Sequence, residues 1–376
     1  YPQTLAVLQT RAQPLGLEIK ICTGDEALNN ESFAVILQYP SLNGEVRDYQ
    51  EWIAQYKTQS KKITGCAGSV IMATDLLALC ILKPPGELGA DIAIGTTQRF
   101  GMPMCNGGPH AAFLACSDAL KRSMPGRLVG ASKDAQGNLA YRLALQTREQ
   151  HIRREKATSN ICTAQVLPAV VASMYAVYHG PQGLRKIAKR IASLSSLFRI
   201  GLQSMGITCE NQYSFDTVCI PSQTKTHDIM RMGLHQEYNF RIFNDASICI
   251  SFDETTTGHD VGHLLALFAQ GLGKAIPQLN PHTGCPVVAA EQLQLALPST
   301  LIRTTSYLQQ KVFHSHHSET AMLRYIRSLS DKDLALDRCM IALGSCTMKL
   351  NATSEMIPMT WPEFAHIHPF APASQR

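Results

Sequence analysis

Two polar stretches of the sequence place nucleophilic and cationic side chains close together. Residues 344–351 put a serine, a cysteine, a threonine and a lysine on a loop that begins with glycine, and an aromatic, proline-containing run follows at 360–364. Residues 146–165 begin with charged side chains and end with hydroxyl and amide groups. Such groups could bind a phosphate or a disulfide-bearing substrate, and a lysine amine could form a Schiff base. For the loop at 344–351, a tight polar turn with a buried cysteine is the alternative.

The composition is that of a globular protein with two or three domains. Hydrophobic residues make up 45% and charged residues 17% of the 376 positions, which suffices for a large buried core. The formal net charge of +5 is mild, and its local basic clusters are typical of solvated helix faces, so we expect no nucleic-acid partner. No apolar run reaches the length of a membrane span, so we expect no membrane partner.

The 12 cysteines are scattered, and no two of them have the CxxC spacing. This pattern disfavours a zinc ribbon and a secreted disulfide scaffold, so we expect reduced thiols. The sequence begins at Tyr1, without an initiator methionine, and we expect both ends to be cuts in a longer chain.

Four short apolar runs in the first part of the chain are typical of buried strands. They are rich in β-branched or aromatic residues and are bounded by turn-forming residues. Helical stretches separate them, so we expect a mostly parallel sheet covered on both faces. The runs are residues 32–38, 69–74, 91–95 and 111–116.

The middle of the chain predicts a long amphipathic helix and then a smaller α/β unit. The helix begins near Leu167, is broken at residues 179–181 and continues to about Leu202, with Gly206 as its C-terminal cap. The smaller unit has three strand-like runs and one helix-like run, at 215–220, 240–243, 248–252 and 262–271. Residues 275–300, rich in proline and glycine, are predicted to be a linker.

Two further motifs are better explained by structure than by chemistry. Residues 314–319 contain three histidines, but their spacing is not the i, i+4 pair of a helical zinc site, so we predict no metal. A helix capped by Ser318, with Glu319 in its first turn, is favoured instead. The glycines at 107 and 108 match neither the dinucleotide-binding nor the P-loop spacing.

The stretches at 146–165 and 344–351 resemble the glycine decarboxylase family, the P-protein of the glycine cleavage system, and the similarity runs through nearly the whole chain. Members are pyridoxal-phosphate (PLP) enzymes, oxidoreductases of glycine catabolism. The resemblance implies an α/β fold of the PLP-dependent transferase type (aspartate-aminotransferase-like, fold type I), with a large domain and a smaller α/β domain. It also implies PLP-dependent decarboxylation of glycine, with transfer of the aminomethyl group to the lipoyl group of the H-protein, by a homodimer of the full-length chain.

The family resemblance also implies a division of the chain. Residues 1–165 would belong to the large PLP-fold domain of a degenerate N-terminal half, and 166–275 would be the small domain. Residues 276–300 would be the linker, and 301–376 the truncated start of the PLP-bearing C-terminal half.

One segment of the chain has the shape of the family's Schiff-base segment. In the family the lysine lies in a His-Lys-Thr-Phe segment before a glycine-rich, proline-containing loop, and residues 95–103 leading into 106–110 have that shape here. Gln98 stands where the lysine would fall, and an amide cannot form a Schiff base. The resemblance therefore implies that the Schiff-base lysine lies outside this chain, which alone would be inactive. Asp75 resembles the acid that contacts the pyridine nitrogen, although a helix-cap or loop role is favoured.

The resemblance assigns a cofactor role to Thr158, Ser159 and Asn160. In this fold, each site of a dimer borrows a small hydroxyl residue from its neighbour to hold the PLP phosphate. A hydroxyl-rich loop at a helix start suits a phosphate. Capping of the following helix is an equally weighted alternative, and the two roles are compatible.

Two more groups of candidate residues follow from the resemblance. The loop at 344–351 would lie near the entrance of the active half, with four cofactor-binding candidates: Ser345, Cys346, Thr347 and Lys349. Arg148 and His151 are candidates for the substrate pocket, with surface ion pairs as the alternative for the arginine.

A rival interpretation is a non-catalytic pseudoenzyme subunit that supports a PLP-bearing partner chain. Residues 301–376 argue against it, because they are similar to the start of the active half. Residues 73–80 are more similar to mitochondrial than to bacterial members, so we expect the mitochondrial matrix, with the bacterial cytoplasm as the alternative.

Overall fold

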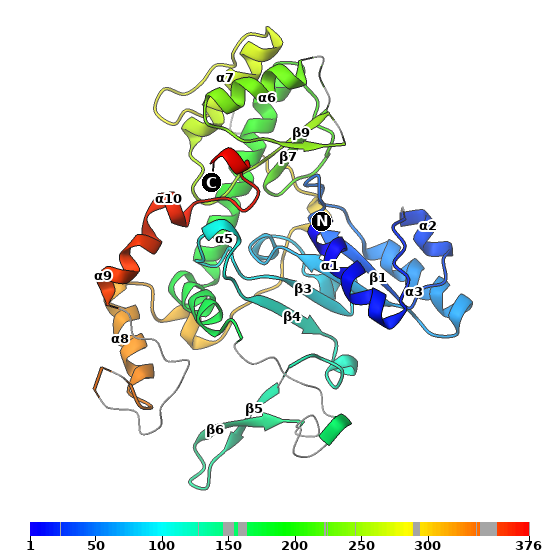
Figure 1. Ribbon diagram of the computed structural model, residues 1–376, viewed down its shortest axis with the longest axis vertical. Helices are drawn as coiled ribbons and strands as arrows, with labels where there is room; N and C mark the ends of the chain where they lie inside the picture. Colours follow the sequence, from blue (N-terminus) through cyan, green and yellow to red (C-terminus); the bar gives the residue numbers. More distant parts are fainter. Residues whose placement is uncertain are drawn as a thin grey trace.

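The computed structural model describes residues 1–22, 24–126, 128–145, 154–156, 164–221, 223, 225–244, 246–288, 294–335, 337–338 and 352–375. The long helix α5 (Val166–Ser204) lies near the middle of the molecule and runs up into a lobe that contains β7 and β9 (Figure 1). The first sheet lies beside this helix and forms the larger lobe (Figure 1). None of the helices within the described residues is long and apolar enough to cross a membrane.

The larger lobe is built on a four-stranded sheet in the order β1-β2-β3-β4. Its strands are β1 (Ala34–Tyr39), β2 (Ser69–Thr74), β3 (Ile92–Thr96) and β4 (Ala112–Cys116). The first three are parallel, and α3 (Gln50–Thr64) makes the crossover between β1 and β2. The predicted runs therefore form strands, β2 with the predicted bounds, and the mostly parallel sheet is confirmed.

Strand β4 departs from the predicted pattern, because it runs antiparallel to β3. The connection from β3 to β4 is a loop with only a short 3-10 turn, and a parallel return would need a longer crossover, usually a helix. Most of the side chains of β4 are exposed, so the expectation that both faces of the sheet would be covered is wrong for this edge.

A hairpin extends from the larger lobe below the first sheet (Figure 1). It pairs β5 (Leu128–Lys133) with β6 (Leu139–Ala144) around a turn in which Asp134 Oδ1 accepts hydrogen bonds from the amides of Gln136 and Asn138. The sequence predicts the turn but not the strands, whose side chains are largely exposed and which therefore lack a continuous apolar run.

Helix α5 is interrupted where the sequence predicts a break. Gly180 has φ 60° and ψ 179°, and Pro181 follows it inside the helix. Proline has no amide hydrogen to donate to the preceding turn. Gly206, with φ 75°, lies just beyond the end of the helix and reverses the chain, as predicted.

The smaller lobe is a three-stranded antiparallel sheet in the order β7-β9-β8. Its strands are β7 (Thr217–Ile220), β8 (Arg241–Phe243) and β9 (Ser247–Ser251), and its helices are α6 (Thr226–His235) and α7 (Gly258–Leu272). A capping box between Thr257 and Asp260 fixes the start of α7. The sequence predicts all three strands and most of α7, but it misses α6.

The segment 301–317, which we call the strap, returns from the smaller lobe to the larger one. The amide of Lys83 donates to the carbonyl of Leu301, and the amide of Arg303 donates to the carbonyl of Ile81. Further along, the Tyr307 hydroxyl donates to the carbonyl of Pro181 at the break in α5, at 2.9 Å. The strap therefore ties the larger lobe to the helix that joins the lobes.

The other helices lie at the two ends of the chain. Ser318 caps α8, because its hydroxyl accepts a hydrogen bond from the amide of Ala321, and Glu319 is in the first turn, as predicted. These helices are α1 (Pro2–Ala12), α2 (Gly24–Asn29), α8 (Glu319–Ser330), α9 (Thr353–Met356) and α10 (Pro362–Ala365), and short 3-10 turns join several elements. The division into domains and linker stays a prediction.

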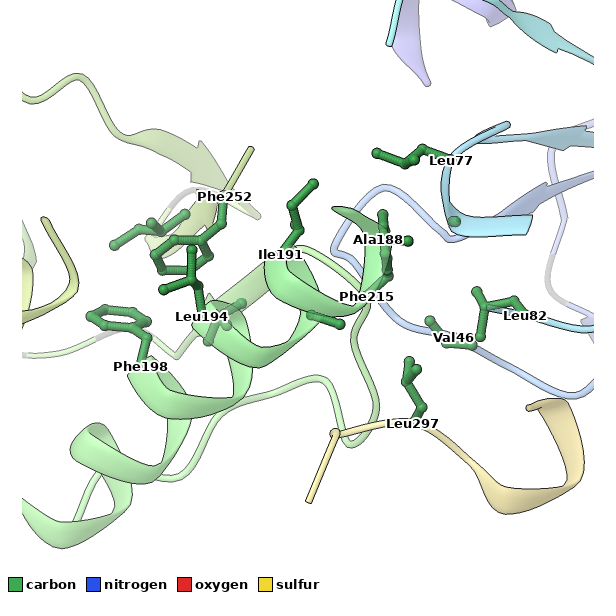
Figure 2. Packing of buried hydrophobic residues seen from close by; sticks show 14 of the residues in the cluster. Val46, Leu77, Leu82, Ala188, Ile191, Leu194, Phe198, Phe215, Phe252 and Leu297 are labelled. Carbon is green, nitrogen blue, oxygen red and sulfur yellow. The ribbon is translucent and has the colours of Figure 1, made fainter. Parts of the chain in front are cut away.

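One apolar core runs through both lobes and passes on either side of α5 (Figure 2). Ile191 and Leu194 on α5 face Phe252 of the smaller lobe, while Val46 and Leu82 belong to the larger lobe (Figure 2). Residues of both lobes and of α5 are thus buried in a single cluster, so the relative position of the two sheets is fixed by packing as well as by chain connection.

Gly180 provides a test of how strongly the strap holds the break in α5. A Cβ added there would lie 2.7 Å from His317 Cε1, at a backbone conformation that side chains disfavour. We expect Gly180→Ala to lower the free energy of unfolding by about 2–5 kcal/mol, from strain and overpacking together.

Gly65→Ala is the matched control for Gly180→Ala. Gly65 also has a positive φ, 83°, but a Cβ there would meet nothing within 4 Å. Gly65→Ala should lower the free energy of unfolding by only about 1–2 kcal/mol, because the backbone conformation alone disfavours alanine. Urea unfolding of both variants measures the difference, and equal losses would contradict a tight contact between strap and helix.

Candidate functional site

The guanidinium of Arg99 lies at the junction of the two lobes, in contact with three carboxylates. Its Nη1 is 2.5 Å from Asp75 Oδ2 and 2.6 Å from Asp216 Oδ2. Its Nε is 3.6 Å from Glu254 Oε1, and its Cζ lies 5.4 Å from the centre of the Phe215 ring. We call Arg99 and its three carboxylates the junction cluster.

The ends of four strands bring the junction cluster together. Asp75 directly follows β2, and Arg99 lies in the turn after β3, so the two start from the carboxyl ends of neighbouring parallel strands. This edge is where open α/β sheets usually bind ligands. Asp216 directly precedes β7 and Glu254 follows β9, and these strands are antiparallel neighbours. One arginine from the larger lobe thus meets two carboxylates from the smaller lobe.

The junction cluster contains more negative than positive charge. One cation faces three carboxylates, and the four side chains are between 18% and 31% exposed. Burial raises the pKa of Asp216, and the neighbouring Asp75 raises it further, against the opposite effect of Arg99. Burial also raises the pKa of Glu254. One guanidinium therefore does not fully compensate the negative charge that it holds.

Asp75 and Gln98 are both committed to local interactions. Asp75 Oδ1 accepts hydrogen bonds from the amides of Leu77 and Ala78, so this residue has the loop role favoured from the sequence. The side-chain amide of Gln98 donates to the carbonyl of Pro103 at 3.2 Å and closes the turn that contains Arg99.

These residues do not fit a PLP ring at this edge of the sheet. The ring needs a lysine amine for its aldehyde and a free carboxylate for its pyridine nitrogen. Gln98 is an amide, and the second oxygen of Asp75 is paired with Arg99. The guanidinium of Arg99 thus occupies the side of the Asp75 carboxylate that would otherwise face a cofactor.

The family model for the glycine cleavage system P-protein matches residues 1–268. The chain belongs to the glycine cleavage system P-protein family. It is also 54% identical over 375 residues to proteins named glycine dehydrogenase (decarboxylating) from Paraburkholderia phytofirmans and Paraburkholderia xenovorans. These matches cover 100% of the chain but 37% of each relative, so the chain spans little more than a third of the length of those relatives.

A solved structure of a P-protein family member has a similar fold. The chain is 28% identical to glycine decarboxylase (P-protein) of the glycine cleavage system in an inhibitor-bound form, with a TM-score of 0.60. The match covers 72% of this chain and 63% of that one. A sphingosine-1-phosphate lyase of Burkholderia pseudomallei, 9% identical with a TM-score of 0.50 over 71% of this chain and 61% of that one, supports the fold alone. The chain thus has the PLP-dependent transferase fold of type I, as expected.

Most of the site residues predicted from the family resemblance lie outside the described residues. The N-cap residue of α5 is Gln165. The alternative role of residues 158–160, capping of the helix that follows them, concerns residues outside the described part of the chain. The predicted residues in question are Arg148, His151, Thr158, Ser159, Asn160, Ser345, Cys346, Thr347 and Lys349.

The sequence pattern does not predict the junction cluster. Its four residues are far apart in the chain, and although Arg99 lies within the segment 95–103, nothing in that segment points to carboxylate partners. A partial signal exists, because Asp75 and Glu254 lie just beyond predicted strand-like runs and Asp216 lies at the start of another, and charged side chains at the ends of neighbouring strands can meet.

Arg99→Met should expose the charge imbalance of the junction cluster. Removing one partner from a largely buried set of ion pairs should lower the free energy of unfolding at pH 7 by about 2–4 kcal/mol. The raised pKa values of Asp216 and Glu254 mean that the folded state binds protons more tightly than the unfolded state. Protonation of these carboxyl groups therefore stabilises the folded state in acid, and this stabilisation is lost as the pH rises. The loss of unfolding free energy in Arg99→Met should thus be smaller at pH 5 than at pH 7.

Arg190→Met is the matched control for Arg99→Met. Arg190 donates to the backbone carbonyls of Glu254 and Thr256, so it holds the same loop without facing the carboxylates. Arg190→Met should lower the free energy of unfolding by about 0.5–1.5 kcal/mol, by the same amount at pH 5 and at pH 7. Urea unfolding at both pH values separates the two variants. A deficit of Arg99→Met that grows in acid would contradict the charge imbalance.

Proposed function

We propose that the full-length protein decarboxylates glycine with PLP, and that this chain supplies its cofactor-free half. The aminomethyl group would pass to the lipoyl group of the H-protein. The observation that carries the proposal is 54% identity, along the whole chain, to proteins named glycine dehydrogenase (decarboxylating). Bound PLP would supply an electron sink that lets the carboxylate of glycine leave as CO₂.

The residues of this chain would act as a scaffold for that reaction. Arg99 neutralises Asp75 from within the protein and draws Asp216 of the smaller lobe onto the same guanidinium. The two lobes are therefore held together without a bound ring. A half stabilised in this way can present a fixed surface to the half that carries the cofactor.

The proposed cofactor contacts come from the sequence pattern. Thr158, Ser159 and Asn160 would hold the PLP phosphate across the interface between halves, because hydroxyl and backbone amide groups suit a phosphate. Arg148 and His151 would line the pocket for glycine. Four residues would lie at the entrance of the active half: Ser345, Cys346, Thr347 and Lys349.

The organisation of the full-length protein is part of the proposal. Residues 1–165 and 166–275 would form the large and small domains of this half, and 276–300 would link it to the start of the active half at 301–376. The full-length chain would form a homodimer. Both Paraburkholderia relatives are bacterial, which favours the bacterial cytoplasm over the mitochondrial matrix.

The pseudoenzyme interpretation is not favoured. The relatives that match the whole chain are single proteins whose names describe the enzyme.

The isolated chain should not bind PLP covalently. Gln98 cannot form a Schiff base, so incubation with PLP and reduction with borohydride should leave no pyridoxyl adduct at a unique residue. The full-length protein, treated in parallel, should carry one adduct. A separate, unreduced sample of it should release CO₂ from carboxyl-labelled glycine in the presence of H-protein. A stoichiometric adduct at Lys349 would overturn our assignment of its loop, and a full-length protein without decarboxylation would overturn the proposed function.

Thr158→Val in the full-length protein should weaken PLP retention. A lost hydrogen bond to a charged phosphate costs about 1.5–3 kcal/mol, or roughly tenfold to a hundredfold in affinity. Valine is close in volume to threonine, so the melting temperature of the apo-enzyme should change little. Thr163→Val, which removes a hydroxyl from the same stretch, is the control and should leave PLP dissociation unchanged. An unchanged affinity in Thr158→Val would leave this residue without a cofactor role.

A further inference from the structure

The sheet of the smaller lobe has one apolar face and one polar face. Four of its hydrophobic side chains belong to the apolar core, namely Val218, Ile220, Ile248 and Ile250. Because side chains alternate along a strand, the residues between them point to the other face. Those residues are small and polar or sulfur-bearing, namely Thr217, Cys219, Ser247, Cys249 and Ser251.

Cys219 and Cys249 stand directly opposite each other on this polar face, on β7 and β9. The amide of Cys219 donates to Asn211 Oδ1, and its carbonyl accepts from the amide of Glu210, so both backbone groups point away from β9. The two cysteines therefore form a non-hydrogen-bonded pair, the closer kind, in which Cα atoms are typically about 4.5 Å apart. That spacing is within the range that a disulfide requires.

Charged groups lie at both ends of the cysteine pair. Cys219 Sγ is 3.2 Å from Glu210 Oε2, and Arg241 on β8 stands directly opposite Cys249. Glu210 and Arg241 are exposed, whereas Cys219 is 0% and Cys249 3% exposed. The two buried thiols therefore lie in a row of carboxylate, thiol, thiol and guanidinium.

The row makes the two thiols chemically unequal. Interaction with the neighbouring Cys219 thiol lowers the pKa of Cys249, and the cation of Arg241 acts in the same direction. The hydrogen bond with Cys249 and burial raise the pKa of Cys219, which keeps its proton next to the Glu210 carboxylate. The guanidinium opposite Cys249 and the carboxylate against Cys219 thus favour Cys249 as the nucleophile, and Cys219 is a thiol with a base in reach.

We propose that Cys219 and Cys249 form a redox-active dithiol, which a small hydroperoxide oxidises to a cross-strand disulfide. The Cys249 thiolate attacks the peroxide: an S–O bond forms, the O–O bond breaks, and the released alkoxide or hydroxide takes up a proton. Cys249 loses two electrons and becomes a sulfenic acid, while the peroxide is reduced.

In the second step Cys219 gives its proton to Glu210, and its sulfur attacks the sulfur of Cys249. The S–S bond forms, the S–O bond breaks, and the hydroxide leaves with the proton as water. In total, two thiols and one hydroperoxide give one disulfide, one alcohol or water, and one further water. Burial of both sulfurs disfavours a bulky disulfide reagent, so a small hydroperoxide is the oxidant that we propose.

The test is peroxide treatment of the folded, reduced full-length protein, followed by thiol blocking and digestion. Trypsin with an additional cleavage after Glu210 separates Cys209 from Cys219. We expect a linked pair of peptides containing Cys219 and Cys249 that has lost two hydrogen atoms, with no change in circular dichroism. Cys209→Ser, which removes another buried thiol, should leave this product unchanged.

Three variants separate the steps. Cys219→Ser should abolish the link and leave Cys249 as a sulfenic acid that dimedone traps. Arg241→Gln should slow the first step by roughly threefold to tenfold, because losing a nearby cation raises the pKa of a thiol. Glu210→Gln should slow only the second step. Two outcomes would overturn the proposal: both thiols survive treatment that oxidises the exposed Cys66, or the link forms only when Cys209 is also modified.

Discussion

The position of one guanidinium, that of Arg99, determines how the two lobes of this chain fit together. Its carboxylate partners Asp75 and Asp216 are 24 and 117 residues away in the sequence, and Glu254 is further still. Apolar packing around α5 holds the lobes together, but such packing is non-directional. The ion pairs add direction, because the N–H groups of a planar guanidinium donate to carboxylates only along fixed directions.

The same arginine explains how a PLP-type fold can persist without PLP at this site. The carboxyl edge of the first sheet retains Asp75 in the place expected for a cofactor-binding acid. Left alone there, a partly buried carboxylate would destabilise the fold. Arg99 supplies the missing positive charge from the protein. Restoring a lysine at position 98 would therefore not by itself restore a cofactor site, because Asp75 would remain paired.

The sequence predicts the elements of this fold better than it predicts the junction cluster. Residues 69–74 form a strand with the predicted bounds, and the break at Gly180 falls where the sequence predicts it, because both signals are local. The direction of β4 was not predicted, because an apolar run does not specify whether its strand is parallel. The exposed hairpin strands were not predicted, since no continuous apolar run marks them. The four residues of the junction cluster meet only after the sheets are assembled, so no spacing in the sequence specifies them.

The strap has a consequence for the order in which the chain can be made and folded. Lys83 and Ile81 obtain their backbone partners from Leu301 and Arg303. At about 5–20 residues per second, a ribosome needs on the order of 10–40 s to travel from one set to the other. During this interval the nascent larger lobe has an open edge at residues 81–83. The larger lobe can therefore be completed only after the strap, which follows the smaller lobe in the sequence, has been synthesised.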